Sequence, residues 1–233
     1  MSRAIPLQST SSKKSILLVD DHPIVLEGLK QLIEQQSDLM VCGELADGRA
    51  TLQTVDKLRP DLAIIDISLK GVNGLEVIKA LREQCPDLPV LALSMHDETL
   101  YAERALRAGA NGYVMKQEAT KNLLNAVRQL LDGGMYLSEN VTAKLLSRMA
   151  KVKPGAKRSA LEGLSDRELQ VFHLIGQGVG TRKIAETLRL SVKTIESHRE
   201  NIKRKLKLED AAALVQHAVS WHQNETPPHA IKQ

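Results

Sequence analysis

Polar residues that can handle a phosphoryl group stand at the ends of four short apolar runs in this chain. The acid pair Asp20 and Asp21 closes the first run, and the other three runs lead into Asp66, Ser94 and Lys116. Three carboxylates brought together suit a hard divalent cation, above all Mg²⁺. That cation, a hydroxyl and an ammonium would together neutralise a phosphoryl group carried by one of the acids. Without a counterion, the three acids would repel one another strongly, which argues against a purely structural role.

Short apolar runs that alternate with helical patterns must position these side chains. Strands are expected near residues 15–20, 39–44, 62–66, 90–94 and 112–115, and helices near 23–36, 47–58, 73–84, 97–108 and 119–132. This order predicts an α/β fold, a doubly wound parallel sheet of five strands with helices on both faces. Ligands of such a sheet bind outside the carboxyl ends of the strands, so we expect the polar side chains to meet there.

The second half of the chain is expected to contain only helices. The spacing of Ser165 and Glu168 is that of a capping box, which starts a first helix. A short helix is expected at about 181–188. Ser191 is a good cap for a helix that runs to about 206, and a last helix should start near Asp210.

These patterns divide the chain into an α/β domain at 15–134, a linker at 135–160 and a small all-α domain at 161–222. The linker should contain a short helix at 139–150 and then a flexible stretch that is basic and holds Pro and Gly. The tail from Gln223 onward is expected to be disordered.

Charge is distributed unevenly along the chain. Residues 15–137 contain 12 Lys and Arg against 18 Asp and Glu, whereas residues 138–233 contain 17 against 10. An acidic lobe joined to a basic lobe indicates two functions, with the basic lobe facing a polyanion. The sequence shows no membrane-spanning stretch and no apolar signal core, so we expect a cytoplasmic protein without membrane contact. Cys42 and Cys85 lack metal-site spacing and are expected to be reduced, mostly buried thiols.

Residues 15–133 resemble the receiver domain of bacterial two-component response regulators. The matching segments are Leu18-Val19-Asp20-Asp21-His22, Asp66-Ile67-Ser68, Gly74-Leu75-Glu76, Leu93-Ser94 and Gly112-Tyr113-Val114-Met115-Lys116. The resemblance implies a flavodoxin-like or CheY-like fold and a sensor histidine kinase that phosphorylates Asp66. It implies no enzyme activity beyond the domain's own phosphotransfer and dephosphorylation.

The same resemblance assigns roles to the other pocket residues. It implies Mg²⁺ held by Asp20, Asp21, Asp66 and the backbone carbonyl of Ser68. Lys116 would contact the phosphoryl group, Ser94 would donate its hydroxyl to it, and Tyr113 would turn inward as a switch. Plain core packing remains the alternative for Tyr113. Ser68 and His96 flank the pocket and would tune the lifetime of the phosphoryl group. The chain departs from the family at Lys70, where proline is common, which loosens the loop after Asp66.

Residues 161–222 are similar to the LuxR-type helix-turn-helix domain. The resemblance rests on Leu164-Ser165-Asp166-Arg167-Glu168, on the segment from Ser191 to Arg199 and on Ile202-Lys203-Arg204-Lys205-Leu206. A receiver joined to this domain is the arrangement of the NarL/FixJ family of transcription regulators. It implies sequence-specific binding to double-stranded promoter DNA as a homodimer, helped by the last helix, and leaves RNA polymerase open as a further contact.

On a helical wheel, Ile195, Ile202 and Leu206 form the core stripe of the recognition helix, and the opposite face is polar and basic. That face suits a major groove, with a merely solvated face as the alternative. The residues expected nearest base edges are Lys193, Glu196, Ser197 and Glu200. The residues expected on phosphates are Arg199, Lys203, Arg204 and Lys205.

Four other residues of this lobe depart from the family pattern or have a role of their own. Gly180 and Lys183 stand where the family often has a Ser-x-x-Glu capping box, so Thr181 is the fallback cap of the second helix. Lys183 adds a charge for a DNA phosphate. His198 lies near the core side of the wheel, where packing or a phosphate contact is favoured over metal binding. With one Phe and one Trp in the whole chain, stacking of single strands is not favoured.

The two lobes are expected to be coupled by a population shift. Without phosphate, the acidic receiver would lie against the basic recognition helix and block it, and phosphorylation would free that helix. Two alternatives stay open: an aspartate-nucleophile phosphohydrolase, and a phosphorylation-independent adaptor that binds only proteins. The first normally has Asp-x-Asp at the nucleophile, whereas Ile67 and Ser68 follow Asp66 here. A protein-binding adaptor needs neither the three acids nor a DNA-recognition helix.

Overall fold

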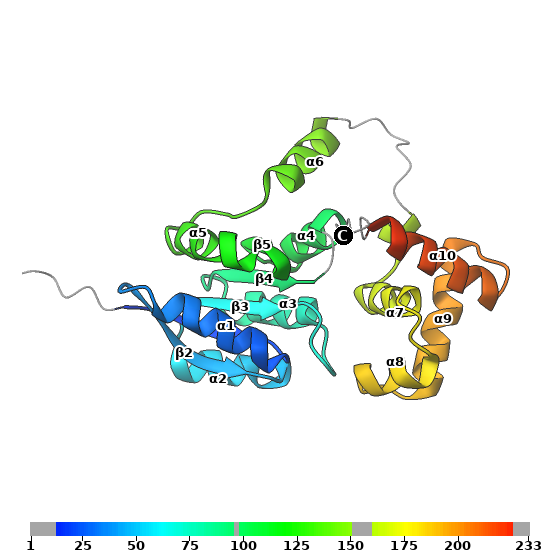
Figure 1. The fold of residues 1–233 in the computed structure, drawn as a ribbon, viewed down its shortest axis with the longest axis horizontal. Coiled ribbons are helices and arrows are strands. Elements are labelled where there is room, and N and C mark those ends of the chain that lie inside the picture. The colour runs from blue at the N-terminus through cyan, green and yellow to red at the C-terminus, as the bar shows by residue number, and fades with distance from the viewer. Residues whose placement is uncertain (1–12, 96–97, 151–159, 226–233) are drawn as a thin grey trace, which may run out of the picture.

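The computed structural model describes residues 13–95, 98–150 and 160–225 of the 233-residue chain. Two lobes follow one another along the chain, a sheet with helices on both faces and then a group of helices (Figure 1). No helix within these ranges is long and apolar enough to cross a membrane. His96 and the basic stretch of the expected linker lie outside the described residues.

The sheet contains five parallel strands in the order β2-β1-β3-β4-β5. The strands are β1 Lys14–Val19, β2 Leu39–Leu45, β3 Leu62–Asp66, β4 Val90–Ser94 and β5 Gly112–Met115. Their central members are almost wholly apolar because helices cover both faces of the sheet. The five-stranded, doubly wound sheet predicted from the sequence is confirmed.

Alternate residues of each strand enter two separate cores. Ile16 and Leu18 of β1 face α1 Pro23–Glu34 and α5 Ala119–Leu131. Leu17 and Val19 face the opposite core, which is covered by three helices. These are α2 Thr51–Leu58, α3 Gly74–Gln84 and α4 Glu98–Ala108. Short 3₁₀ turns precede α2 and α5, namely η1 Gly48–Ala50 and η2 Lys116–Glu118.

The register of the strands brings the polar residues at their carboxyl ends to one edge of the sheet. Val19 pairs with Ile65, so Asp20, which directly follows β1, lies beside Asp66, the last residue of β3. Ser94 pairs with Met115, which places Lys116 directly beyond that pair. This edge is the carboxyl end of the parallel strands, as expected for the ligand side of the fold.

Gly74 allows α3 to begin directly behind Asp66. A Cβ atom built on Gly74 would collide with the backbone oxygen of Asp66 and lie 2.7 Å from the Cα of Ile67. Asn73 caps the helix by accepting a hydrogen bond from the Leu75 amide at 2.9 Å. A larger residue at position 74 would therefore push α3 away from the end of β3.

Helix α6 Glu139–Ala150 occupies the position expected for the short helix of the linker. The described part of the second lobe is helical and begins with the turn η3 Ala160–Gly163. It continues with α7 Asp166–Gly176, α8 Thr181–Leu188, α9 Val192–Leu206 and α10 Ala211–Glu225. Phe172 is fully buried at its centre, with its ring centroid 5.6 Å from that of Trp221.

The predicted capping residues are confirmed for two of these helices. Ser165 and Glu168 form the complete capping box of α7, and the Ser191 hydroxyl accepts from the Thr194 amide at 3.0 Å. The prediction for α8 was wrong, because its N-cap is Gly180 and no side chain caps it. Thr181 already has its place in the first helical turn, whereas a side-chain cap needs the non-helical residue before it.

The C-terminal tail begins later than the sequence indicated. Residues Gln223–Glu225 belong to α10, so the disorder expected from Gln223 onward is wrong for these three residues. The residues after Glu225 lie outside the described part of the chain.

Candidate phosphoryl-transfer site and nucleic-acid interface

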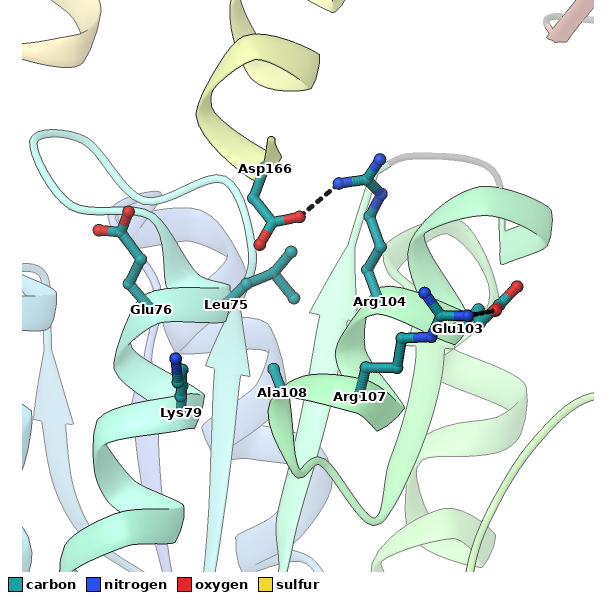
Figure 2. Close-up of a pocket in the computed structure, with 8 residues that line it drawn as sticks. All are labelled: Leu75, Glu76, Lys79, Glu103, Arg104, Arg107, Ala108 and Asp166. Carbon is teal, nitrogen blue, oxygen red and sulfur yellow. Dashed lines mark hydrogen bonds and ion pairs between the residues drawn. The ribbon is translucent and has the colours of Figure 1, made fainter. Parts of the chain in front are cut away.

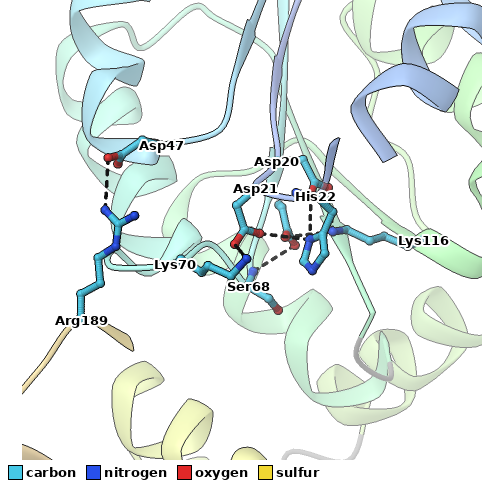
Figure 3. Close-up of polar contacts among 9 residues, drawn as sticks. Asp20, Asp21, His22, Asp47, Ser68, Lys70, Lys116 and Arg189 are labelled. Carbon is cyan, nitrogen blue, oxygen red and sulfur yellow. Dashed lines mark hydrogen bonds and ion pairs between the residues drawn. The ribbon is translucent and has the colours of Figure 1, made fainter. Parts of the chain in front are cut away.

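A buried ion cluster occupies the carboxyl edge of the sheet (Figure 3). The Lys116 ammonium lies 2.6 Å from Asp20 Oδ2 and 2.9 Å from Asp66 Oδ2. All three side chains are almost completely buried, with at most 5 % of their surface exposed. Charges removed from water in this way need close partners, and Lys116 supplies one to each acid.

The environment of Asp66 opposes its ionised form. Burial raises the pKa of its carboxyl group above the ordinary value, and the nearby Asp20 charge raises it further. Lys116 and the Ser68 amide, which donates to Asp66 Oδ1 at 3.0 Å, act in the opposite direction without cancelling the rise. The nucleophilic, ionised carboxylate therefore depends on the cations beside it.

Four residues at this edge have the composition of a divalent-metal site. Asp20, Asp21, His22 and Asp66 each offer one donor atom, and these atoms lie within 4.8 Å of one another. Three buried carboxylate oxygens, Asp20 Oδ2 and both oxygens of Asp21, form no well-aligned hydrogen bond within the described structure and lie near only the side-chain nitrogens of Lys116, His22 and Lys70. Hard oxygen donors with unused lone pairs are what Mg²⁺ binds, so the residues fit that ion.

Two basic side chains at the site were not predicted from the sequence to contact the acids. The Nδ1 atom of His22 lies 3.0 Å from Asp20 Oδ1 and from Asp21 Oδ1. The Lys70 ammonium lies 3.1 Å from Asp21 Oδ2. Lys70 departs from the family pattern, and that departure is the only sequence signal for its contact with Asp21.

The remaining predicted pocket residues occupy the same region. Ser94 is fully buried at the end of β4, and Ser68 follows Asp66 by two residues. Tyr113 is 2 % exposed and belongs to the core on the α4 side of the sheet, together with Tyr101 and Ala102. Tyr113 is therefore turned inward in this conformation.

The predicted recognition helix is α9, and its polar face is open. Ile195 and Ile202 are completely buried, whereas the positions assigned to base edges are exposed: Lys193, Glu196, Ser197 and Glu200. The positions assigned to phosphates are exposed or partly exposed: Arg199, Lys203, Arg204 and, on α8, Lys183. The ammonium of Lys183 lies 3.1 Å from Glu186 Oε2.

Two basic residues of α9 lie beside residues of α7. The Lys205 ammonium donates to Glu168 Oε2 at 2.6 Å, so Lys205 links α9 to α7. Burial lowers the pKa of His198 below its ordinary value, with a smaller opposing effect of Glu168. A neutral, partly buried imidazole favours the packing role over the phosphate contact.

The receiver lobe contacts α7 and α8 of the second lobe. Arg104 of α4 donates to Asp166 at 2.6 Å and to the carbonyl oxygens of Leu161 and Leu164 at 3.0 Å each. Asp166 also lines a groove of about 390 Å³ between α3 and α4 (Figure 2). Arg189, at the end of α8, lies 3.6 Å from Asp47 of the receiver (Figure 3).

A cavity of about 230 Å³ separates the phosphoryl-transfer edge from α7. Ser68, Lys70 and Lys116 line it from the receiver, and Gln170 and His173 line it from α7. The expectation that the receiver covers the recognition helix was wrong for this conformation. The polar face of α9 is largely exposed, and the ion pairs between the lobes engage α7 and the end of α8 instead.

Comparison with known proteins identifies both lobes. The family described as response regulator receiver domain matches residues 16–128, and the family described as bacterial regulatory proteins of the luxR family matches residues 162–218. The nitrate/nitrite response regulator protein NarL of Escherichia coli K12 is 34 % identical over 217 residues, covering 92 % of this chain and 98 % of its own. The chain belongs to the NarL/FixJ family of response regulators.

Other similar proteins agree with this result. The oxygen regulatory protein NreC of Staphylococcus carnosus is 34 % identical, with coverage of 88 % of this chain and 96 % of its own. A solved structure of RcsB from Salmonella typhimurium aligns at 28 % identity with a TM-score of 0.65, covering 90 % of this chain and 98 % of that one. RcsB of Salmonella enterica bound to the promoter rprA with the phosphomimetic BeF₃⁻ aligns with a TM-score of 0.60, at 28 % identity and coverages of 89 % and 99 %. The present chain is therefore a two-component regulator of transcription.

Proposed function

We propose that a histidine kinase phosphorylates Asp66 of this NarL/FixJ regulator, and that the phosphoryl group controls binding of α9 to promoter DNA. The observation that carries the proposal is the buried cluster in which Lys116 contacts both Asp20 and Asp66. A lysine placed between two carboxylates at the ligand edge of a parallel sheet is ready to contact a new anion on either acid.

The transfer itself is a displacement at phosphorus. An oxygen of Asp66 forms a bond to phosphorus while the bond from phosphorus to the donor's histidine nitrogen breaks, and the imidazole leaves with the bonding electron pair. Mg²⁺ held by Asp20, Asp21, Asp66 and the Ser68 carbonyl would supply positive charge to the phosphoryl oxygens. The Lys116 ammonium already lies 2.9 Å from Asp66 Oδ2 and follows the charge onto the phosphoryl group.

The signal then passes to α4 through β4 and β5. Ser94 ends β4 in register with Met115, and the same strand β5 carries Tyr113 beneath α4. A hydroxyl drawn toward the phosphoryl group moves this edge of the sheet and with it α4. This movement of α4 breaks the hydrogen bond between Arg104 and Asp166, and the two lobes separate.

Separation would change how two copies meet on DNA rather than uncover α9. Leu214 and Ala218 of α10 are fully buried, whereas Val215 is 40 % exposed and offers an apolar surface for a second copy. RcsB has been solved as dimers bound to DNA. Two copies of this chain paired through α10 would place their recognition helices on half-sites about one helical turn apart.

The test is phosphorylation of the purified chain by acetyl phosphate with Mg²⁺, followed by intact mass and by operator binding. The wild-type chain should gain the mass of one phosphoryl group and bind operator DNA more tightly. Asp66→Asn should gain no mass and show no change in affinity. The matched control is Asp87→Asn, at an exposed aspartate of the same lobe, which should behave as wild type. Labelling of Asp66→Asn at the wild-type level would move the nucleophile elsewhere and overturn the proposal.

A further inference from the structure

Lys70 places a second ammonium group against the acid cluster. It lies in the loop between β3 and α3, and its Nζ atom is 3.1 Å from Asp21 Oδ2 (Figure 3). The Asp21 carboxylate is 4 % exposed, whereas the Lys70 side chain is 52 % exposed. Lys70 therefore reaches from solvent to a buried acid that is one of the expected metal ligands.

The partners of the three acids are divided between two lysines. Lys116 contacts Asp20 and Asp66, whereas Lys70 forms an ion pair with Asp21. His22 adds its ring nitrogen on the other oxygen of Asp21. Two lysine ammonium groups thus offset part of the negative charge of the three acids, and Lys70 supplies that charge at Asp21.

We propose that Lys70 is a built-in competitor of the divalent cation and sets the metal affinity of the pocket. The inference rests on the proposed function, because it takes Asp21 as a ligand of Mg²⁺. Neither Asp21 oxygen makes a well-aligned hydrogen bond within the described structure, so the carboxylate is engaged only by the close approach of Lys70 and His22, and Lys70 is the lysine among them. A cation that binds Asp21 must displace the ammonium or accept its repulsion, and both effects weaken metal binding.

The loop that carries Lys70 has a second neighbour in the DNA-binding lobe. A Cβ atom built on Gly71, whose φ is +84°, would lie 2.9 Å from the Arg189 side chain. Arg189 is therefore packed on the residue next to Lys70, which limits how far this loop retreats while the lobes are in contact. The displaced ammonium consequently stays near the metal site, and its repulsion persists.

Titration calorimetry of the unphosphorylated full-length chain with MgCl₂ tests the inference. Lys70→Met keeps the length of the side chain and removes its charge, so we expect its Kd for Mg²⁺ to fall about five-fold, which is about 1 kcal/mol. Lys70→Arg keeps the charge and should retain the wild-type Kd within about two-fold. Lys57→Met changes the same net charge at an exposed residue of α2 and is the matched control.

Thermal unfolding gives a second readout that does not depend on phosphorylation. Without metal, Lys70→Met should melt below the wild-type chain because Asp21 loses its neutralising partner. With saturating Mg²⁺, the variant should gain more in Tm than the wild-type chain, because tighter binding gives more stabilisation. Raised ionic strength should shrink the difference in Kd, since the competing charge is partly exposed.

The outcomes separate this inference from the proposed function. If the wild-type chain takes up no Mg²⁺, the proposed metal-dependent function is at fault. If the wild-type chain binds Mg²⁺ and Lys70→Met binds it with the same Kd and the same gain in Tm, the proposed function stands and the role of Lys70 is overturned. A gain in affinity that Lys57→Met reproduces would assign the effect to net charge and also overturn it.

Discussion

The guanidinium of Arg104 in the receiver donates a hydrogen bond of 2.6 Å to the carboxylate of Asp166 in the DNA-binding lobe. Asp166 opens α7, so its negative charge also lies at the positive end of that helix. The second nitrogen of Arg104 donates to Leu161 and Leu164, whose carbonyl oxygens belong to the turn before α7. One arginine on α4 thus holds both the turn and the helix that begin the second lobe.

Replacing Arg104 with alanine should separate the lobes without phosphorylation. Its side chain is only 14 % exposed, and its removal leaves three acceptors of the second lobe without their donor. Each charge-assisted hydrogen bond is worth about 1 to 3 kcal/mol, so the docked population should fall at least about ten-fold. Small-angle X-ray scattering should show a larger radius of gyration for Arg104→Ala than for the wild-type chain.

The matched control for this variant is Arg107→Ala, one turn further along α4. Arg107 is 73 % exposed and pairs with Glu103 of its own helix at 2.5 Å. The substitution Arg107→Ala should therefore leave the radius of gyration unchanged. Equal radii of gyration for Arg104→Ala and the wild-type chain would show that Arg104 does not hold the lobes together.

Replacing Lys116 with methionine should damage both the folded state and the chemistry. Asp20 and Asp66 would then be buried side by side without the ammonium that contacts each of them. Removal of one partner from a buried ion pair costs about 3 kcal/mol or more of unfolding free energy. Labelling by acetyl phosphate should slow by about 100-fold, because Lys116 also neutralises the transferred group. Urea denaturation and timed mass spectra measure the two effects.

A second substitution distinguishes charge from packing in this result. Combining Lys116→Met with Asp20→Asn removes one of the two unpaired acids and should restore part of the lost unfolding free energy. If the double variant is as unstable as the sum of the single variants, the damage comes from the lost lysine stem and not from repulsion between Asp20 and Asp66.

Local signals in the sequence predicted the fold and the main pocket closely. Apolar runs gave the strands, and the positions of Asp20, Asp66 and Lys116 after those runs placed them at one edge of the sheet. The capping box of Ser165 and Glu168 marked the start of α7 correctly, since both partners lie within one helical turn. Such features depend on neighbours in the chain and are therefore visible without a structure.

Contacts between residues far apart in the sequence leave no local pattern from which they could be predicted. Arg104 and Asp166 are 62 positions apart and belong to different lobes, so their spacing contains no signal. The expectation that opposite charges bring the receiver onto α9 failed for this reason, because net charge does not specify which helix is engaged. The hydrogen bond from Lys205 to Glu168 on α7 likewise joins residues 37 positions apart.

The pair of Glu168 and Lys205 should make the second lobe sensitive to acid. Burial tends to raise the pKa of Glu168, but hydrogen bonds from Lys205 and from the Ser165 amide outweigh burial and lower it below 4.5. An acid with a lowered pKa binds protons more readily in the unfolded state, so its stabilisation is complete above 4.5 and is lost as the pH falls through the folded value.

Glu168→Gln should therefore flatten the dependence of stability on pH in this acidic range. At pH 7 it should also lower the unfolding free energy by about 1 to 2 kcal/mol, because it weakens a charge-assisted hydrogen bond and the helix cap. Thermal melts between pH 3 and 7, monitored by the fluorescence of Trp221, measure both effects. Glu209→Gln, at an exposed glutamate, is the control. An unchanged profile for Glu168→Gln would mean that its pKa is not lowered on folding.

Lys183 should contribute to DNA affinity without contributing to sequence choice. It lies on α8, which precedes the recognition helix, and it is 72 % exposed while paired with Glu186 at 3.1 Å. Lys183→Ala should weaken binding to operator and random duplex alike, and should reduce the slope of log K against log salt by about 0.9. Glu186→Ala frees the same lysine and should strengthen binding to both duplexes. Fluorescence anisotropy at several salt concentrations measures these slopes. A loss confined to the operator would show that Lys183 reads a base rather than the phosphate backbone.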